Sequence, residues 1–464
     1  MKTTRSLLAL IILFSPLAAR AQSASTAPAP AQQRPPVLQP TAKTLPRPST
    51  DAPVETDAAI IEDVLPLVEE RPAFYNQGVL VEKLSGEVVR EQAADQAYNP
   101  ASAIKLATAL VALRTFGPKH RFATTLWVTG SFDKATGTVT GDLIVSGRDP
   151  SFHDEHAVAI ARELNQLGIR TVTGDLVVAP RFTMNFSWSS QRSGERFYDT
   201  LDATRRPAAA TRAWNDLRFA MRDQAGLAAT PSVAVMGAVY VDSVPKAARV
   251  VSTHYSPPLV DILKVLLCYS NNFMAERLGD QVGGAQGLAR FLSTELGISA
   301  ADMRIATASG LGVNRLTPRH MMRVYRALLD ELHKNRLKAA DILPVAGVDP
   351  GTLEKRYANS VGRGSVIAKT GTLPRTDGGA SALVGQMRAR NGEVLLFVIL
   401  NQRGSVSRFR SWQDALVAEL QGERGGPTPF TYTPQTLAMR LSASEFDSAR
   451  AGNLEEYEPT TANQ

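Results

Sequence analysis

Residues 102–113 form a helical pattern that is apolar on almost every side, and this segment constrains the fold more than any other. A helix of that kind cannot lie on a surface, because it has no polar face to turn toward water. Lys105 is the one charged residue in the run. A buried lysine is costly unless it is paired or put to use. The sequence therefore predicts a helix in the middle of a domain, with one amine available for chemistry.

Helical and strand patterns on both sides of this run predict a mixed domain. Two short apolar runs flank Ser85-Gly86, which indicates a β-hairpin over 79–89. Thr317 fits a helix N-cap and Pro318 fits the first helical position. Further helices are expected at 259–268, 272–282, 285–296, 318–333 and 407–420, and further strands at 365–369, 380–387 and 394–400.

The segment 120–251 separates two halves of this domain and contains a repeat. The pattern of 138–145 recurs at 171–178, and a helical pattern lies between the two β-rich copies. Two copies are too few for a solenoid. We therefore interpret this segment as a small α+β insert, which leaves 58–119 and 252–424 as the main domain.

The ends of the chain differ in composition from the rest. Residues 1–21 combine a basic start, a short apolar run and a small-residue cleavage site, which predicts a cleaved secretory signal peptide; a retained N-terminal anchor is the alternative. Residues 22–57 are expected to be a disordered linker, and 425–464 a flexible tail. The mature protein is expected to act outside the cytoplasm, with no membrane span. The single cysteine, Cys268, excludes an internal disulfide.

Three Ser-x-x-Lys tetrads occur, and their contexts separate them. The tetrad at Ser131 lies in an expected hairpin turn, and the one at Ser243 contains Pro245, which denies it a helix interior. Only Ser102 and Lys105 open a strong helix, where positions i and i+3 share one face. Burial lowers the pKa of a lysine, so Lys105 can act as a base toward the Ser102 hydroxyl. Alternatively, Ser102 only caps the helix.

A second motif, Lys369-Thr370-Gly371-Thr372, stands at the end of a strand pattern. A lysine, hydroxyl groups and a glycine on an edge strand can bind a substrate carboxylate while the backbone runs alongside a peptide. The four residues are expected to be substrate-binding, with Gly371 permitting a close approach. An ordinary strand-to-turn junction is the alternative.

A third motif, Tyr269-Ser270-Asn271-Asn272, lies between two expected helices and can be divided in two ways. Ser270 with Asn272 supplies a hydroxyl that can relay a proton and an amide that can hold a peptide. Tyr269 with Asn271 fits the corresponding β-lactamase pattern, and a plain helix cap is a third interpretation. The order Ser-x-x-Lys, Ser-x-Asn, Lys-Thr-Gly is typical of β-lactamases and penicillin-binding proteins.

The chain resembles the penicillin-binding protein 4 type of D-alanyl-D-alanine carboxypeptidase and endopeptidase over roughly residues 78–401. Matching stretches include Gly141-Asp142-Leu143, Ser256-Pro257-Pro258-Leu259, Ser270-Asn271-Asn272 with Ala275-Glu276, and Ser309-Gly310-Leu311 with Asn314-Arg315. The resemblance implies an α/β (α+β) fold of the serine β-lactamase/DD-peptidase type, with helices flanking an antiparallel sheet. It favours Ser270 and Asn272 within the third motif, because the family separates its first two motifs by a long insert.

The resemblance also implies a reaction and its participants. Ser102 would form an acyl-enzyme with peptidoglycan stem peptides or β-lactams, Lys105, Ser270 and Asn272 would be catalytic, and the backbone N–H groups of Ser102 and Thr372 would form the oxyanion hole. No cofactor, metal or nucleic acid is expected. The rivals are a β-lactamase on the same scaffold and a non-catalytic penicillin sensor or cell-wall scaffold.

The sequence departs from the family pattern at three places, and it also contains a histidine-rich segment that could be mistaken for a zinc site. Thr307-Ala308 stands where the family usually carries an acidic residue, the segment 373–379 is longer than usual, and the insert is short. His153-Asp154-Glu155-His156 could suggest a zinc site, but its two histidines are three positions apart, which favours a solvated helix start.

Overall fold

The computed structural model describes residues 76–221, 230–358, 361–436, 440 and 443–448. The expected signal peptide (1–21) and linker (22–57) lie outside the described residues. Among the described helices, none is both long and apolar enough to cross a membrane.

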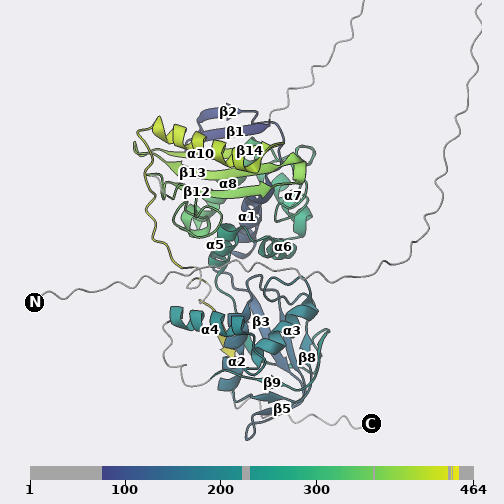
Figure 1. Cartoon of the computed structure of the whole chain (residues 1–464). Helices are drawn as coiled ribbons and strands as arrows, with labels where there is room; N and C mark the ends of the chain where they lie inside the picture. The colour runs from purple at the N-terminus through teal and green to yellow at the C-terminus, as the bar shows by residue number, and fades with distance from the viewer. Residues whose placement is uncertain (1–75, 222–229, 359–360, 437–439, 441–442, 449–464) are drawn as a thin grey trace, which may run out of the picture. The chain divides into compact units, whose positions relative to one another are not determined.

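A five-stranded antiparallel sheet forms the centre of the main domain (Figure 1). Its order is β12 (Val366–Leu373), β13 (Ala380–Arg388), β14 (Val394–Gln402), β1 (Gln77–Lys83) and β2 (Val88–Gln92). The predicted hairpin is confirmed, since β1 pairs with β2 and also with β14, from the other end of the chain. The expected fold class, helices flanking an antiparallel sheet, is confirmed.

Side chains alternate between the two faces of this sheet, and each face has its own core. On one face, Val398 and Leu400 of β14 pack with α1 (Lys105–Phe116), α5 (Leu259–Tyr269) and α8 (Pro318–Lys334). On the other face, Phe397 and Ile399 pack against α10 (Val406–Gly422). Among the described residues, the main domain also contains the helical elements η1 (Ala101–Ile104), α6 (Asn272–Gln281), α7 (Gly284–Leu296), η3 (Ala300–Asp302), α9 (Ala339–Ile342) and η4 (Thr376–Gly378).

The helix α1 is enclosed as its sequence predicts, and residues 105–113 are all buried. Its start differs from the expectation. Ser102 lies in the preceding 3₁₀ turn η1, and the α-helix begins at Lys105. Ala101 has a positive φ of 47°, so the chain enters this turn in a conformation that non-glycine residues seldom adopt. The serine therefore projects from a tight turn instead of from the first turn of the α-helix.

The described residues of the insert form three helices and, together with β15 from the C-terminal segment, two sheets. A six-stranded sheet has the order β10 (Val239–Val241), β8 (Leu176–Val178), β6 (Leu143–Gly147), β3 (Ala123–Val128), β11 (Arg249–Tyr255) and β15 (Glu445–Ser448). A four-stranded sheet has the order β4 (Ser131–Asp133), β5 (Thr138–Thr140), β7 (Thr171–Val172) and β9 (Ala234–Val235). The helices are α2 (Asp154–Gln166), α3 (Ser190–Leu201) and α4 (Ala208–Met221).

The repeat of the insert has a structural basis, and it has three copies where the sequence indicated two. The copies pair in parallel and in register: β5 with β7 and then β9, and β6 with β8 and then β10. Asp142 accepts from the backbone of Asp175, and Asp175 accepts from the backbone of Ala238. A Cβ at Gly237 would lie 2.2 Å from the Asp175 carboxylate, so this contact requires glycine. The third copy is not evident in the sequence because Ala238 stands where the other two copies have an aspartate.

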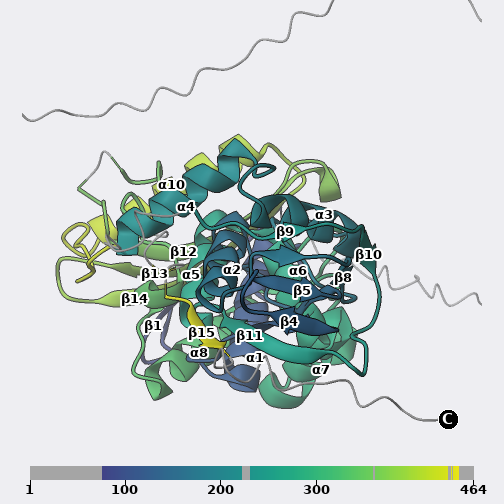
Figure 2. The ribbon, with the colours of Figure 1, turned by 90° about the horizontal axis from the view of Figure 1, so that it is seen from below.

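The expectation of a flexible tail from Gly425 is wrong for part of the described segment. Strand β15 pairs with β11 in antiparallel fashion and runs beside it in Figure 2. Phe446 packs against the core of the insert, and Tyr432 reaches back to Asp349 of the main domain. Polar composition misled the prediction, because the strand is held by its backbone pairing, by Phe446 and by polar contacts such as that of the Ser448 hydroxyl with Glu163.

The division into domains stays our proposal, and the cores support it. One large core joins residues of α1 to residues of α5 and α8, although the insert separates them in the sequence. Another core contains residues 126–251 alone, with Phe446 packed against it.

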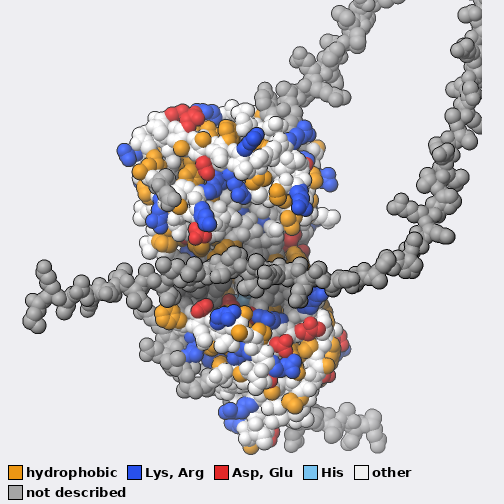
Figure 3. Space-filling model, in the orientation of Figure 1, with side chains coloured by type: hydrophobic (Ala, Val, Ile, Leu, Met, Phe, Trp, Pro, Cys, Tyr) orange, Lys and Arg blue, Asp and Glu red, His pale blue; other side chains and the backbone are white. Residues whose placement is uncertain are grey.

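Basic and acidic side chains lie interspersed over the face in Figure 3.

Candidate active site

The Lys105 amine lies at the centre of a group of three oxygen atoms. Its Nζ is 3.0 Å from Ser102 Oγ, 2.7 Å from Asn272 Oδ1 and 2.5 Å from the Ser309 carbonyl oxygen. The two carbonyl oxygens can only accept hydrogen bonds. A neutral amine that donates to both of them has its lone pair left for the Ser102 hydroxyl. This arrangement suits removal of a proton from Ser102.

Burial supports the neutral form of this amine. Lys105 is fully buried, and loss of solvation lowers the pKa of Lys105 to about 7, against a weaker opposing effect of Glu276. Ser102 itself is only partly buried and can meet a substrate. The amine is therefore poised to change its charge near neutral pH.

Glu276 on α6 supports the backbone that contacts Lys105. Its carboxylate accepts hydrogen bonds from the N–H groups of Ser309, at 2.8 Å, and Ala308, at 3.3 Å. This is the segment in which the chain lacks the acidic residue usual for the family it resembles. Sequence reasoning gave Glu276 no role, although the pair Ala275-Glu276 already matched the family.

Ser270 and Asn272 occupy the junction between α5 and α6. Ser270 ends α5 in the left-handed conformation, with φ of 56°, and its Oγ lies 2.8 Å from Lys369 Nζ. Asn271 caps α6 through the Met274 N–H, so its side chain is engaged in the helix end. Tyr269 is 52% exposed. The geometry thus brings Ser270 and Asn272 to the two lysines and favours that division of the third motif over Tyr269 with Asn271.

Lys369 is fully buried on β12, and its amine contacts Ser270 and the Thr370 carbonyl oxygen, the latter at 2.6 Å. Burial, together with the nearby charge of Lys105, holds the pKa of Lys369 well below its usual range. The two amines therefore belong to one site. The expected substrate-binding role of Lys369 stays a prediction, and its amine contacts the Ser270 hydroxyl at 2.8 Å.

Thr372 and Arg410 form the open part of the same strand. Arg410 of α10 donates to Thr372 Oγ1 at 2.8 Å, and its side chain is exposed. A Cβ on Gly371 would lie 2.7 Å from the Pro100 carbonyl oxygen, so the glycine lets β12 approach the turn that carries Ser102. The sequence motif identified Thr370, Gly371 and Thr372 but could not identify Arg410, which comes from a helix 38 residues away.

The longer segment after β12 is anchored beside this site. Asp377 forms an ion pair with Arg315 at 2.7 Å and accepts from Asn99 at 2.7 Å. These two partners, Arg315 first, lower the pKa of the Asp377 carboxyl. Asn99 stands three residues before Ser102 and also holds the Ala101 N–H at 3.0 Å. The segment thereby braces the turn that presents the serine.

One group of side chains in the described residues could hold a metal ion: the ligand atoms of His153, Glu155 and His156 lie within 4.8 Å of one another. However, His156 Nδ1 accepts from the His153 N–H, and His153 Nδ1 contacts the Ser151 carbonyl oxygen. The expected solvated helix start is wrong in one respect, since His156 is fully buried. These contacts make the group a helix cap of α2.

A family model described as the D-Ala-D-Ala carboxypeptidase 3 (S13) family matches residues 62–210 and 224–421. A carboxypeptidase of Mycobacterium tuberculosis is 26% identical over 416 residues, which cover 83% of this chain and 89% of that protein. A D-alanyl-D-alanine carboxypeptidase of Actinomadura sp. is 27% identical over 449 residues, covering 76% and 82%. A carboxypeptidase of Mycolicibacterium smegmatis is 32% identical, but over only 36% of this chain and 38% of that protein.

Solved structures share the fold. A predatory endopeptidase from Bdellovibrio bacteriovorus has a TM-score of 0.68 at 22% identity, covering 81% of this chain and 100% of that one. Penicillin binding protein 4 from Haemophilus influenzae has a TM-score of 0.55 at 22% identity, covering 75% and 96%. The family model spans most of the chain, including the elements that carry all three motifs, and the protein belongs to the D-Ala-D-Ala carboxypeptidase 3 (S13) family.

Proposed function

We propose that this serine D-Ala-D-Ala carboxypeptidase and endopeptidase cleaves peptidoglycan stem peptides through an acyl-enzyme on Ser102. The observation that carries the proposal is the position of Lys105, whose amine is held by two carbonyl acceptors and faces the Ser102 hydroxyl. A serine made nucleophilic by a neighbouring base is the general arrangement for covalent acyl transfer.

Acylation begins when Ser102 Oγ attacks the carbonyl carbon of the penultimate D-alanine and Lys105 takes the hydroxyl proton. The oxyanion of the tetrahedral intermediate is stabilised by the backbone N–H groups of Ser102 and Thr372. The carbon–nitrogen bond then breaks, and the leaving amine receives a proton. Water subsequently attacks the ester, which releases the peptide and restores the Ser102 hydroxyl.

The leaving amine receives its proton through Ser270. The Ser270 hydroxyl contacts the Lys369 amine, and both lysines belong to one electrostatically coupled site. Asn272 holds Lys105 in place and is available to the peptide backbone of the substrate. Lys369 thus acts behind Ser270 as part of the proton path.

The terminal carboxylate of the substrate binds to Thr370, Thr372 and Arg410. Arg410 is exposed and already directed at Thr372, and a guanidinium group can bind a carboxylate through two parallel hydrogen bonds. Gly371 allows the substrate backbone to lie along the edge of β12. In this proposal Arg410 binds the terminal carboxylate, a role that the sequence motif had suggested for Lys369.

We also propose that the protein works outside the cytoplasm, in the periplasm or an equivalent space, after cleavage of residues 1–21. The basic, apolar and small-residue pattern of this segment supports export. β-Lactams should acylate the same serine, as suggested by the penicillin G-acylated form of the Bdellovibrio endopeptidase.

The proposed function is tested by incubating the purified protein with a synthetic pentapeptide ending in D-Ala-D-Ala and with cross-linked muropeptides. We expect release of D-alanine and cleavage of the cross-link, both abolished by Ser102→Ala and retained by the matched variant Ser131→Ala. Rapid turnover of penicillin with no peptide cleavage would instead identify a β-lactamase. Penicillin binding with turnover of neither substrate would identify a sensor.

A further inference from the structure

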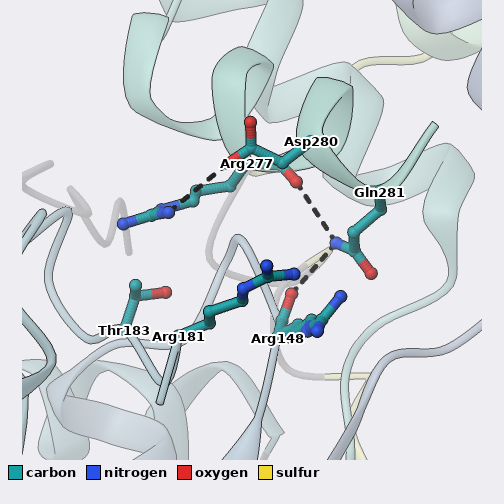
Figure 4. Close-up of a pocket in the computed structure, with 6 residues that line it drawn as sticks. All are labelled: Arg148, Arg181, Thr183, Arg277, Asp280 and Gln281. Carbon is teal, nitrogen blue, oxygen red and sulfur yellow. Dashed lines mark hydrogen bonds and ion pairs between the residues drawn. The ribbon is translucent and has the colours of Figure 1, made fainter. Parts of the chain in front are cut away.

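A pocket of about 270 Å³ lies where loops of the insert face α6, outside the group of residues proposed for catalysis. Six side chains line it, three from α6 and three from loops of the insert (Figure 4): Arg277, Asp280, Gln281, Arg148, Arg181 and Thr183. Arg277 follows Asn272 by five positions, or about 8 Å along the helix. The pocket is therefore a neighbour of the catalytic centre and not a part of it.

The pocket carries an excess of positive charge. It contains three guanidinium groups and a single carboxylate, that of Asp280, which Arg277 reaches at 3.4 Å. Within the part of the chain that the structure describes, no carboxylate lies within ion-pair distance of Arg148 or Arg181. Arg277 Nε is buried and has no hydrogen-bond partner among the described residues. Three guanidinium groups that line one pocket beside a single carboxylate leave an excess of positive charge, which a bound anion would offset.

The loop that carries Arg181 is held in an unusual conformation. Arg181, Asn185 and Phe186 all have positive φ values, of 71°, 52° and 60°. Such conformations cost free energy at non-glycine residues and persist where the surrounding structure imposes them. Asn185 is fixed by Asp154 and Phe152, and Trp188, further along the loop, covers Arg277 with its ring at 4.9 Å. The loop is thereby locked against α6 with Arg181 at the pocket.

We propose that this pocket binds a phosphate group. The lining residues carry a net charge of +2, which a phosphomonoester dianion neutralises and a single carboxylate does not. Guanidinium forks match the oxygen geometry of phosphate, and the Thr183 hydroxyl provides a further donor. Because Arg148 and Arg181 belong to the insert and Arg277 to α6, a bound phosphate joins these two parts of the chain.

The test titrates inorganic phosphate and glycerol 3-phosphate into the full chain by calorimetry at low ionic strength. We expect saturable binding that Arg181→Gln weakens by roughly 10-fold or more, because a charged hydrogen bond is lost. The matched variant Arg212→Gln, exposed on α4 and outside the pocket, should bind like the wild type. Asp280→Asn should tighten binding, since it removes the opposing charge. Glycerol 3-phosphate should bind more tightly as its dianion forms between about pH 5 and 7.

Several outcomes would overturn the proposal: no saturable phosphate binding, equal binding by Arg181→Gln, or succinate binding as tightly as phosphate. Vesicles containing phosphatidylglycerol distinguish the source. Vesicle binding that Arg181→Gln abolishes assigns the phosphate to a lipid headgroup, and binding of the small phosphates alone assigns it to a soluble or polymer-borne group. Penicillin acylation of Ser102, measured on the same samples, reports the proposed function independently and should be unchanged in Arg181→Gln.

Discussion

The Lys105 amine lies 2.7 Å from the side-chain oxygen of Asn272, although 167 positions separate the two residues in the sequence. The contact joins the helix that follows the nucleophile to the helix that follows Ser270. This contact and the contact with the Ser309 carbonyl oxygen together orient both N–H bonds of a neutral Lys105 amine. In the neutral form, the amine would then direct its lone pair at the Ser102 hydroxyl, as acylation requires.

Acylation should depend on pH through Lys105. Since burial lowers the pKa of Lys105 to about 7, the neutral, active form is lost as the pH falls through 7. The rate of penicillin acylation should therefore rise from pH 5 to 9, with a midpoint near 7. Lys105→Ala should abolish acylation, and Lys105→Arg should fail as well, because a guanidinium group cannot release its proton. An active Lys105→Arg variant would show that the lysine supplies only positive charge.

The same pKa shift predicts an effect on stability. The pKa of Lys105 is lower in the folded state, so the unfolded chain binds more protons between about pH 7 and 10.5, and stability rises with pH in that window. Lys105→Met removes this penalty. We therefore expect Lys105→Met to be more stable than the wild type at pH 7. This advantage in the free energy of unfolding should decrease by a few kcal/mol between pH 7 and 9.5.

Denaturant titrations at the two pH values measure this difference. Ser102→Ala serves as the control at the same site, since it removes no titratable group, and its difference from the wild type should not vary with pH. A pH-independent difference for Lys105→Met would mean that Lys105 is charged in the folded protein.

The third motif can be divided as Ser270 with Asn272 or as Tyr269 with Asn271, and the two divisions predict opposite effects of variants on the acylation rate. Ser270 contacts Lys369, whereas Tyr269 is largely exposed. Ser270→Ala should lower the acylation rate by about 10²–10⁴-fold, as expected for one positioned proton-transfer group. Tyr269→Phe should have little effect. Stopped-flow acylation of both variants decides the matter, and the reverse ranking would favour the β-lactamase pattern.

Arg410 should act in substrate binding. Arg410→Gln removes a charged partner for the terminal carboxylate and should raise KM for a D-Ala-D-Ala peptide by roughly 10-fold. Arg408→Gln, on the exposed part of the same helix, is the control and should leave KM unchanged. Steady-state kinetics with a peptide ending in an amide instead of a carboxylate should remove the difference between wild type and Arg410→Gln. If the difference persists with the amide, Arg410 does not bind the carboxylate.

Much of the fold and the candidate site could be predicted because the signals are local. The apolar helix around Lys105, the hairpin at Gly86 and the strand before Lys369 each follow from short patterns. Glu276 and Arg410 could not be predicted in the same way. Their roles depend on which helix packs beside which strand, and a sequence pattern contains no such information.

Three further features could not be predicted from the sequence, for physical reasons of the same kind. The position of Lys369 behind Ser270 depends on how deeply β12 is buried, which strand periodicity does not reveal. The third copy of the repeat is defined by backbone pairing, and Ala238 lacks the side chain that marks the other two. Strand β15 adds to the insert sheet through its backbone, despite its polar composition.

The central claim is that Ser102 is the nucleophile, and peptide mapping of the penicillin adduct tests it most directly. The protein would be incubated with a labelled penicillin, digested and analysed by mass spectrometry, with Ser102→Ala treated in parallel. We predict one adduct on the peptide that contains Ser102, and none in the variant. An adduct on Ser131 or Ser243, or a Ser102→Ala variant that is still labelled, would contradict the account.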